Sequence, residues 1–323
     1  MSLEHVRTLR LSEHLLGFYD GRVAGQKFAS GPNWVDDGAL SLGVCSYALI
    51  DGAEAIVYDT HISTAHGMLI RHTLEGLGVR RIVVALSHWH LDHVAGTAAF
   101  ADCEIVASRL TSERLTQHQS AIESGILNGP PAISPLILPT TVFDARTRLT
   151  AGKLRADLIE FDIHSVDGTA LHVADDGVLL VGDMLEDTVT YVTEPDRLER
   201  HLDELDRLRE LRARRIYPDH GSDRVIAATG YSEGFILATQ RYIRDLLRVP
   251  REPALADLDL RTFVAASLEA GWITYYEPYE RVHRRNVERV AGEGLTSTSA
   301  RGRLAERPSF PYACPRVRAR GWA

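Results

Sequence analysis

Four side chains that can bind metal ions lie close together between residues 87 and 96. This segment reads Ser-His-Trp-His-Leu-Asp-His-Val-Ala-Gly, and its metal-competent members are His88, His90, Asp92 and His93. Residues i and i+2 of an extended segment point the same way, so His88 and His90 can bind one cation together. Asp92 and His93 come after the chain turns and can hold a second cation. Imidazole and carboxylate ligands suit zinc, with iron and manganese as credible substitutes.

Two expected elements flank this cluster. Residues 81–86 form an apolar, β-branched run with polar ends, which is typical of a buried strand. Residues 94–100 indicate the opening of a short helix. As an alternative, Asp92 could cap this helix and the histidines could be ordinary loop residues. A cluster of four metal-competent side chains favours the metal site.

Composition and length restrict the class of protein. The chain has 323 residues, of which 45% are hydrophobic and 25% charged, and a net charge of −8. This length allows one large α/β domain or two small ones, and the acidic balance argues against a nucleic-acid or anionic-membrane partner. Three scattered cysteines (Cys45, Cys103 and Cys314) fit a reducing compartment and argue against a thiolate metal cage. With no signal-peptide core near the N-terminus and no membrane-length apolar run, we expect a cytoplasmic protein with a small-molecule substrate.

The first half of the chain alternates between strand-like and helix-like segments. Strands are expected at 15–23, 40–50, 55–59 and 104–108, and helices at 67–77 and 111–124. Asp59 ends one of these strands, where it could orient a metal ligand or simply cap the next turn. His61 is a weaker candidate for the edge of the site. His66 and His72 are expected on a helix surface.

Two loops could shape a pocket. Residues 24–38 include Phe28 and Trp34, which could line a substrate or pack against their own domain. Residues 128–139 are rich in proline and apolar side chains, so no regular element is expected there. This second segment could be a lid or a connection between two halves of the chain, and we favour the connection.

Three further metal-competent residues follow strand-like segments in the second half. The expected pairs are strand 158–164 with His164, strand 178–181 with Asp183, and strand 215–217 with His220. Strand 178–181 forms a hairpin with 170–174. Sites of α/β proteins lie beyond the carboxyl ends of strands, so these three residues could meet the first cluster.

Helices predominate in the last third of the chain. They are expected at 193–214, where Thr193 and Asp196 make a plausible cap, and at 232–248, 258–270 and 279–290. The aromatic residues between 272 and 279 indicate a seam against the body or a homodimer contact more than a substrate pocket. The chain is therefore divided into a main domain (1–230), a helical extension packed on it (231–291) and a mobile tail (292–323).

The order of the candidate residues resembles that of the metallo-β-lactamase superfamily. The matching positions, over about the first 230 residues, are Asp59, His88-x-His90-x-Asp92-His93, His164, Asp183 and His220. The resemblance implies an α/β fold, an αββα sandwich of two mixed β-sheets with outer helices, here followed by a C-terminal helical extension. Two departures stand out. The usual Gly-His-Thr of the third motif is Ile163-His164-Ser165, and where acyl-homoserine-lactone lactonases place a tyrosine this chain has Glu186 and Asp187.

The resemblance also implies a role for each residue. His88, His90 and His164 would hold a first metal ion. Asp92, His93 and His220 would hold a second, and Asp183 would bridge the two. Two divalent ions are therefore implied, Zn²⁺ first, with Fe or Mn possible.

Charge counting indicates what such a centre does. Two divalent cations outweigh Asp92, Asp183 and a bridging hydroxide by about one positive charge, because the histidines bind as neutral ligands. A positive site polarises a carbonyl and lowers the pKa of bound water from ~16 toward ~7. Asp92 or Asp183 could steer the hydroxide or pass a proton to the leaving group. We therefore predict a dinuclear metallo-hydrolase acting on an ester, thioester, lactone or amide.

Other functions share parts of this pattern. Persulfide dioxygenases keep both histidines of the H-x-H pair and use a single iron ion, and ribonuclease Z carries the same ligand series in a phosphodiesterase. The acidic balance counts against a nuclease. A non-catalytic metal-bound scaffold is disfavoured because every ligand position is filled.

Overall fold

The protein, described here for residues 1–296 from a computed structural model, is built on two mixed β-sheets. The first has seven strands in chain order: β1 (Arg7–Arg10), β2 (Leu15–Asp20), β3 (Val44–Asp51), β4 (Glu54–Tyr58), β5 (Arg81–Ala85), β6 (Glu104–Ser108) and β7 (Thr141–Phe143). Strands β1 to β4 pair antiparallel, and β4 to β7 pair parallel. The parallel half therefore delivers the loops after β4, β5 and β6 to one edge of the sheet.

The second sheet has five strands. Its spatial order is β12 (Arg215–Tyr217), β11 (Val178–Leu180), β10 (Thr169–Val173), β9 (Leu154–Glu160) and β8 (Arg146–Ala151). Strands β11 and β12 are parallel, while β8, β9, β10 and β11 alternate in direction. The carboxyl ends of β9, β11 and β12 consequently lie at the same edge, and each leads into one of the three later candidate residues.

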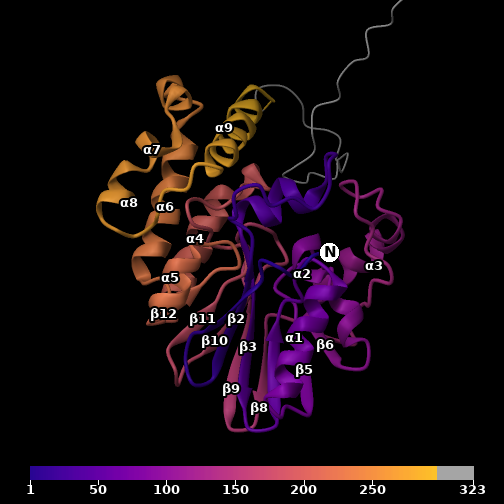
Figure 1. Cartoon of the computed structure of the whole chain (residues 1–323). Coiled ribbons are helices and arrows are strands. Elements are labelled where there is room, and N and C mark those ends of the chain that lie inside the picture. Colours follow the sequence, from indigo (N-terminus) through magenta and orange to yellow (C-terminus); the bar gives the residue numbers. More distant parts are fainter. Residues whose placement is uncertain (297–323) are drawn as a thin grey trace, which may run out of the picture.

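Helices cover the outer faces of both sheets (Figure 1). The first sheet carries α1 (Thr64–Gly76), α2 (Leu91–Val94), α3 (Arg109–Glu123) and two short helices, η1 (Val35–Leu40) and η2 (Thr97–Phe100). The second carries η3 (Pro195–Arg197), α4 (Leu198–Arg209), α5 (Asp223–Ala228), α6 (Glu233–Arg248), η4 (Pro253–Asp257), α7 (Leu260–Phe263), α8 (Ala265–Glu269) and α9 (Tyr279–Thr296). The fold is thus the αββα sandwich that the sequence predicted.

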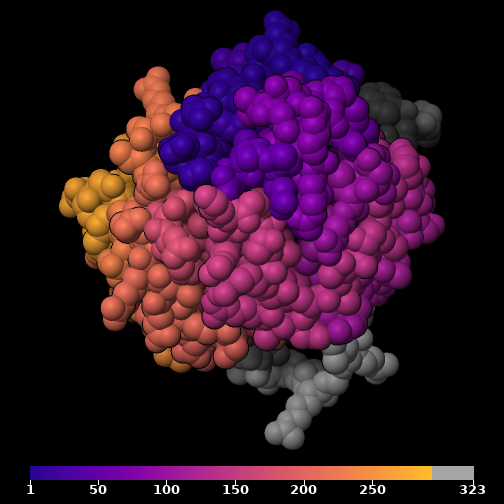
Figure 2. Space-filling model, turned by 90° about the horizontal axis from the view of Figure 1, so that it is seen from below, coloured from indigo at the N-terminus to yellow at the C-terminus, as the bar shows by residue number. Residues whose placement is uncertain are grey.

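Two hydrophobic clusters hold these layers together. One packs α1 and α3 against the outer face of the first sheet, with Ile70, Leu74 and Leu115 buried from the helices. The other fills the space between the sheets and extends under α4, α6 and α9. Figure 2 views the molecule from below, where the first and second halves of the chain are in contact, and the turn before β9 meets the turn after β3 through Lys153 N, which donates to Asp51 Oδ2 at 2.6 Å. Both sheets are therefore fixed relative to each other at the end opposite the site.

The two loops expected to shape a pocket pack on each other. Trp34 is buried, and its indole N–H donates to the carbonyl of Pro131 at 2.9 Å. Residues 128–139 have no regular structure, as predicted, but they connect α3 to β7 within the first half of the chain. The connection between the two halves of the chain is instead the short turn from β7 to β8. Trp34 therefore packs against its own domain.

Several predicted elements differ from the structure. Strand β1 was not predicted, the strand expected at 158–164 is β9 at Leu154–Glu160, and the strand expected from residue 40 begins at Val44 after the π-helical turn η1. The helix expected at 193–214 is η3 followed by α4, and that expected at 258–270 is divided into α7 and α8. Thr193 does not cap a helix, since its hydroxyl donates to the carbonyl of His164.

The C-terminal boundary also differs. Helix α9 continues to Thr296, beyond residue 291, where the helical extension was expected to end. Most of the predicted tail, residues 297–323, lies outside the described residues. Within residues 1–296, none of the helices has the length and apolar character needed to cross a bilayer.

At Gly96, behind the cluster of residues 88–93, the backbone is packed so closely that a side chain has no room. A Cβ there would lie 1.9 Å from the carbonyl oxygen of Thr60, whereas a Cβ at Gly76, at the end of α1, would have no neighbour within 4 Å. We expect Gly96→Ala to lower the free energy of unfolding by about 3 kcal/mol or more. Gly76→Ala is the control and should raise it by about 0.5 kcal/mol. Denaturant unfolding of both variants checks this, and equal stabilities would contradict the close packing.

Candidate metal centre

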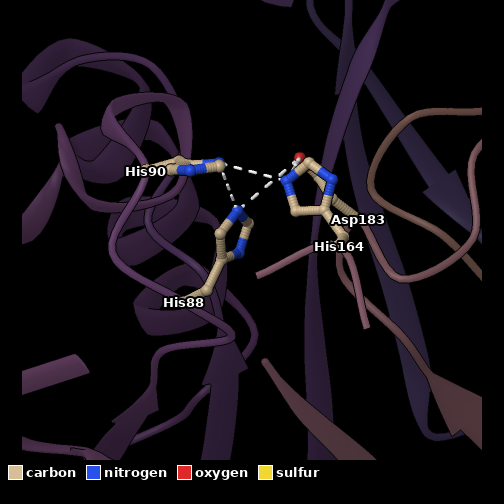
Figure 3. A group of neighbouring side chains, drawn as sticks. All are labelled: His88, His90, His164 and Asp183. Carbon is tan, nitrogen blue, oxygen red and sulfur yellow. Dashed lines mark hydrogen bonds and ion pairs between the residues drawn. The ribbon is translucent and has the colours of Figure 1, made fainter. Parts of the chain in front are cut away.

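Three histidines and one aspartate converge at the edge of the sandwich. His88 Nε2 lies 2.8 Å from His90 Nδ1, which lies 3.2 Å from His164 Nε2. Asp183 Oδ2 is 3.7 Å from the Nε2 atoms of both His88 and His164. Figure 3 shows these side chains pointing toward one another, His88 and His90 from the loop after β5 and the other two from the loops after β9 and β11. Four potential donor atoms therefore surround one small volume, as a tetrahedral cation requires.

A second group lies on the other side of Asp183. Asp92 Oδ2 is 3.1 Å from His220 Nε2, and Asp92 Oδ1 is 3.6 Å from His93 Nε2. Asp183 belongs to both groups, because its Oδ2 is 3.2 Å from His93 Nε2 and its Oδ1 is 3.5 Å from His220 Nε2. The structure thus brings together all seven candidate ligands from the sequence. The donor sets also correspond to the two sets that the resemblance implied.

The donor set fits metal ions better than a self-contained hydrogen-bond network. Among the described residues, none donates a hydrogen bond to the buried Oδ1 of Asp183. An orphaned carboxylate oxygen in a buried site costs free energy unless a cation or another donor meets it. The ring nitrogens of His88, His90 and His164 lie 2.8–3.2 Å apart. Three neutral rings carry too few protons to donate hydrogen bonds both to one another and to Asp183.

Contacts behind the histidines set which ring nitrogen faces the centre. His164 Nδ1–H donates to the carbonyl of Tyr191 at 3.0 Å, and His220 Nδ1–H donates to that of Gly43 at 2.7 Å. A carbonyl only accepts, so the lone pair of each ring lies on Nε2, toward the site. His88 Nδ1 contacts Ser87 Oγ at 2.9 Å, and the same hydroxyl donates to Asp59. These partners fix the ring orientations before any ligand arrives.

His93 is held by two buried carboxylates. Its Nδ1 lies 2.9 Å from Asp59 Oδ2 and 3.1 Å from Asp219 Oδ2, and all three side chains have no exposed surface. Asp59 thus contacts a candidate ligand from behind, as the first of the two roles considered for it from the sequence requires. This role of Asp219 behind His93 was not predicted. In the sequence, only its position next to His220 could have indicated it.

The pKa values follow from burial and from the carboxylates. Burial lowers the pKa of both His88 and His90 well below the usual value, which keeps these rings neutral and able to coordinate. Burial also opposes protonation of His220, but Asp183 and Asp92 outweigh it and raise its pKa to about 10. The carboxylates likewise raise the pKa of His93. The second group therefore attracts positive charge.

Asp167 connects two ligand-bearing loops and was missed from the sequence, where it belonged to an ordinary turn. Its fully buried carboxylate accepts from the backbone N–H of Trp89 at 3.0 Å and from the hydroxyl of Ser165. Trp89 stands between His88 and His90, and Ser165 follows His164. A single carboxylate thus holds the loops that supply the three histidines of the first group.

We expect Asp167→Ala to weaken metal binding by about 10- to 100-fold, the usual effect of losing a group behind metal ligands. Zinc affinity measured by competition with a chromophoric chelator tests this. Asp175→Ala, at an exposed hairpin position, serves as the control. Unchanged zinc affinity in the Asp167 variant would show that the ligand loops hold their geometry without it.

The remaining histidines of the described residues belong to neither donor group. His66 was expected on a helix surface, but it is buried, and its Nε2–H donates to Asp20 at 3.0 Å. The prediction was wrong because α1 begins at Thr64, three residues before the predicted start, which turns His66 toward β2. His61 is buried with its ring stacked on His66 at 4.5 Å, and His72 is exposed as predicted.

Comparison with known proteins adds the family. The family model described as "Metallo-beta-lactamase superfamily" matches residues 40–220, which is more than half of the chain. The chain belongs to the metallo-β-lactamase superfamily. Its matched region begins before β3 and ends at His220, so it contains all seven candidate ligands. Among the curated proteins none matches the sequence.

Solved metallo-β-lactamases share the fold. The DIM-1 metallo-β-lactamase is 16% identical and has a TM-score of 0.54, with 74% of this chain and 97% of that one covered. A metallo-β-lactamase from Pontibacter korlensis is 14% identical, has a TM-score of 0.57 and covers 74% and 99%. VMB-1 is 14% identical, has a TM-score of 0.54 and covers 84% and 100%. Family membership and the His/Asp groups together indicate a metal-dependent hydrolase of the metallo-β-lactamase superfamily.

Proposed function

We propose that the protein is a dinuclear zinc hydrolase that cleaves an ester, thioester, lactone or amide of a small molecule. The observation that carries this proposal is the position of Asp183. Its two oxygens face His93 at 3.2 Å and His220 at 3.5 Å, and one of them also faces His88 and His164. A carboxylate shared between two donor sets supports two ions held side by side rather than one.

The residues of the chain have separable tasks in this proposal. When bound, the two cations supply the positive charge that polarises a carbonyl and the acidity that yields a nucleophile from water. The histidines hold their lone pairs toward the site through the contacts behind them. The Asp92 side chain, which is 13% exposed against 6% for Asp183, is the more accessible carboxylate. We assign to Asp92 the proton that must reach the leaving group.

The second donor set bears on the alternatives. A mononuclear iron oxygenase needs only one set, whereas Asp92, His93 and His220 provide another that is nearly complete by itself. A nuclease is disfavoured by the net charge of −8. The small-molecule hydrolase therefore remains the function that the geometry supports best.

Metal-dependent turnover tests the proposal. Chelator-stripped protein, before and after reloading with zinc, is assayed on a panel of aryl esters, thioesters, lactones, amides and phosphodiesters. We expect zinc to raise the hydrolysis of at least one carbonyl substrate about 100-fold or more. Cleavage of phosphodiesters alone, or oxygen consumption by iron-loaded protein without any hydrolysis, would overturn it in favour of the alternatives.

A further inference from the structure

The segment from residue 186 to residue 193 lies between the metal centre and the C-terminal extension. On one side it contacts ligand residues, and on the other it is hydrogen-bonded to residues 274–289. The match to the family model ends at residue 220. The extension therefore reaches the centre from outside the region that carries all the ligands.

Thr274 contacts one end of this segment. Its backbone N–H donates to Asp187 Oδ1 at 2.7 Å, and its hydroxyl donates to Asp187 Oδ2 at 2.5 Å. Asp187 N–H in turn donates to the carbonyl of His220 at 3.1 Å. Thr188 adds a bond in the opposite direction, from its hydroxyl to the carbonyl of Thr274 at 2.8 Å. Thr274 is thus two hydrogen bonds away from a ligand of the second group.

Asn286 of α9 contacts the other end. It is fully buried, and its Oδ1 accepts from Val192 N–H at 2.9 Å while its Nδ2 donates to the carbonyl of Thr190 at 3.0 Å. Between these two residues lies Tyr191, whose carbonyl accepts from His164 Nδ1–H. One amide side chain therefore holds the peptide groups on both sides of the acceptor that orients a ligand of the first group.

The conformation of His164 makes this support necessary. His164 has φ +65°, a left-handed conformation that a residue with a side chain adopts only when its surroundings hold it. Its ring is oriented by Tyr191, and its carbonyl accepts from the hydroxyl of Thr193. The side chain of Arg289 donates to the Thr193 carbonyl at 3.0 Å. Both of these contacts to His164 thus lead back to α9.

We propose that the C-terminal extension is a working part of the metal centre, with Asn286 positioning His164 and Thr274 positioning His220. Neither residue touches the donor atoms, so both act through the 186–193 segment. This inference rests on the proposed function, since it assumes that the seven ligands bind metal.

The two contacts can be broken separately. We expect Asn286→Ala to weaken zinc binding at the His88/His90/His164 position about 10- to 100-fold, and Thr274→Val to weaken it at the Asp92/His93/His220 position by a similar factor. Stepwise zinc affinities are measured on the full chain by chelator competition. The ¹H–¹⁵N signals of the histidine Nδ1–H groups in zinc-loaded protein report each site, and Asn286→Ala should move the His164 signal while leaving that of His220 in place.

A control variant separates positioning from stability. Gln240→Ala removes another buried side-chain amide, on α6, whose Nε2 donates to Asp206 Oδ1 at 2.9 Å instead of to the 186–193 segment. It should leave both zinc affinities within about twofold. If Asn286→Ala does not fold, Asn286→Asp keeps the acceptor for Val192 but loses both amide donors, and the same affinity loss is expected.

The outcomes are distinct. Wild-type zinc affinities and an unmoved His164 signal in the Asn286 variant would overturn the inference. An equal loss of affinity in the Gln240 variant would also overturn it, because the effect would then be one of stability. Wild-type protein that binds no zinc would instead overturn the proposed function itself.

Discussion

Asp183→Asn is expected to lower zinc-dependent hydrolysis about a thousandfold, which corresponds to the several kcal/mol that a correctly held cation contributes to a transition state. Asparagine has nearly the same shape, but it carries no charge and has one acceptor oxygen where Asp183 presents two. The shared contacts at 3.2 Å to His93 and 3.5 Å to His220 would no longer come from one carboxylate. Turnover and metal content of the same preparation are the measurements.

The matched control is Asp175→Asn, an equal change of charge at an exposed hairpin position. It should leave kcat and zinc content unchanged. Full activity and two bound ions in the Asp183 variant would exclude a bridging carboxylate and with it the proposed mechanism. Loss of activity with zinc content unchanged would show that Asp183 contributes through its charge and geometry more than by retaining the metal.

Metal removal is expected to make the stability of the protein strongly dependent on pH. In metal-free protein the carboxylates raise the pKa of His220 to about 10 against the opposing effect of burial. A raised folded pKa contributes stability that is fully present below the unfolded value of ~6.5 and is lost as pH rises through ~10. Burial depresses the pKa of His88 and His90, so the unfolded chain takes up their protons first as pH falls below ~6.5. Stability should therefore be highest near neutral pH.

Thermal unfolding of chelator-treated and zinc-loaded protein between pH 5 and 10 measures this effect. The zinc-loaded protein should lose much less stability toward pH 10, because a coordinated His220 is neutral in the folded state and has no proton to lose. It should also melt at higher temperature, since a ligand at 1,000 times its Kd adds about 4 kcal/mol. Parallel pH profiles for the two forms would contradict the placement of His220 among the ligands.

The short-range part of the centre could be predicted from the sequence. His88, His90, Asp92 and His93 fall within six residues, and a strand followed by a turn is enough to bring them together. Asp183 and His220 were also predictable, because each follows a short apolar strand. Their strands β11 and β12 are parallel neighbours in the structure, so both residues come to the same edge.

The parts that depend on distant partners could not be predicted. The strand before His164 ends at Glu160, since its register is set by pairing with Thr169 on β10, and His164 lies in the loop beyond. Asp167 and Asn286 contact backbone groups that are 78 and 94–96 residues away in the chain. The local sequence identifies Asp167 only as an aspartate in a turn and Asn286 only as an asparagine in a helix, and it does not indicate their distant partners. Edge strand β1 was missed because Leu9 is the only apolar residue among its four, so the segment resembles a loop.

The most direct test of the account is anomalous diffraction at the zinc edge from crystals grown with zinc. Two peaks per chain are expected. One should lie among His88, His90, His164 and Asp183, and the other among Asp92, His93, His220 and Asp183. A single peak, or peaks away from Asp183, would contradict a centre in which one carboxylate serves two ions.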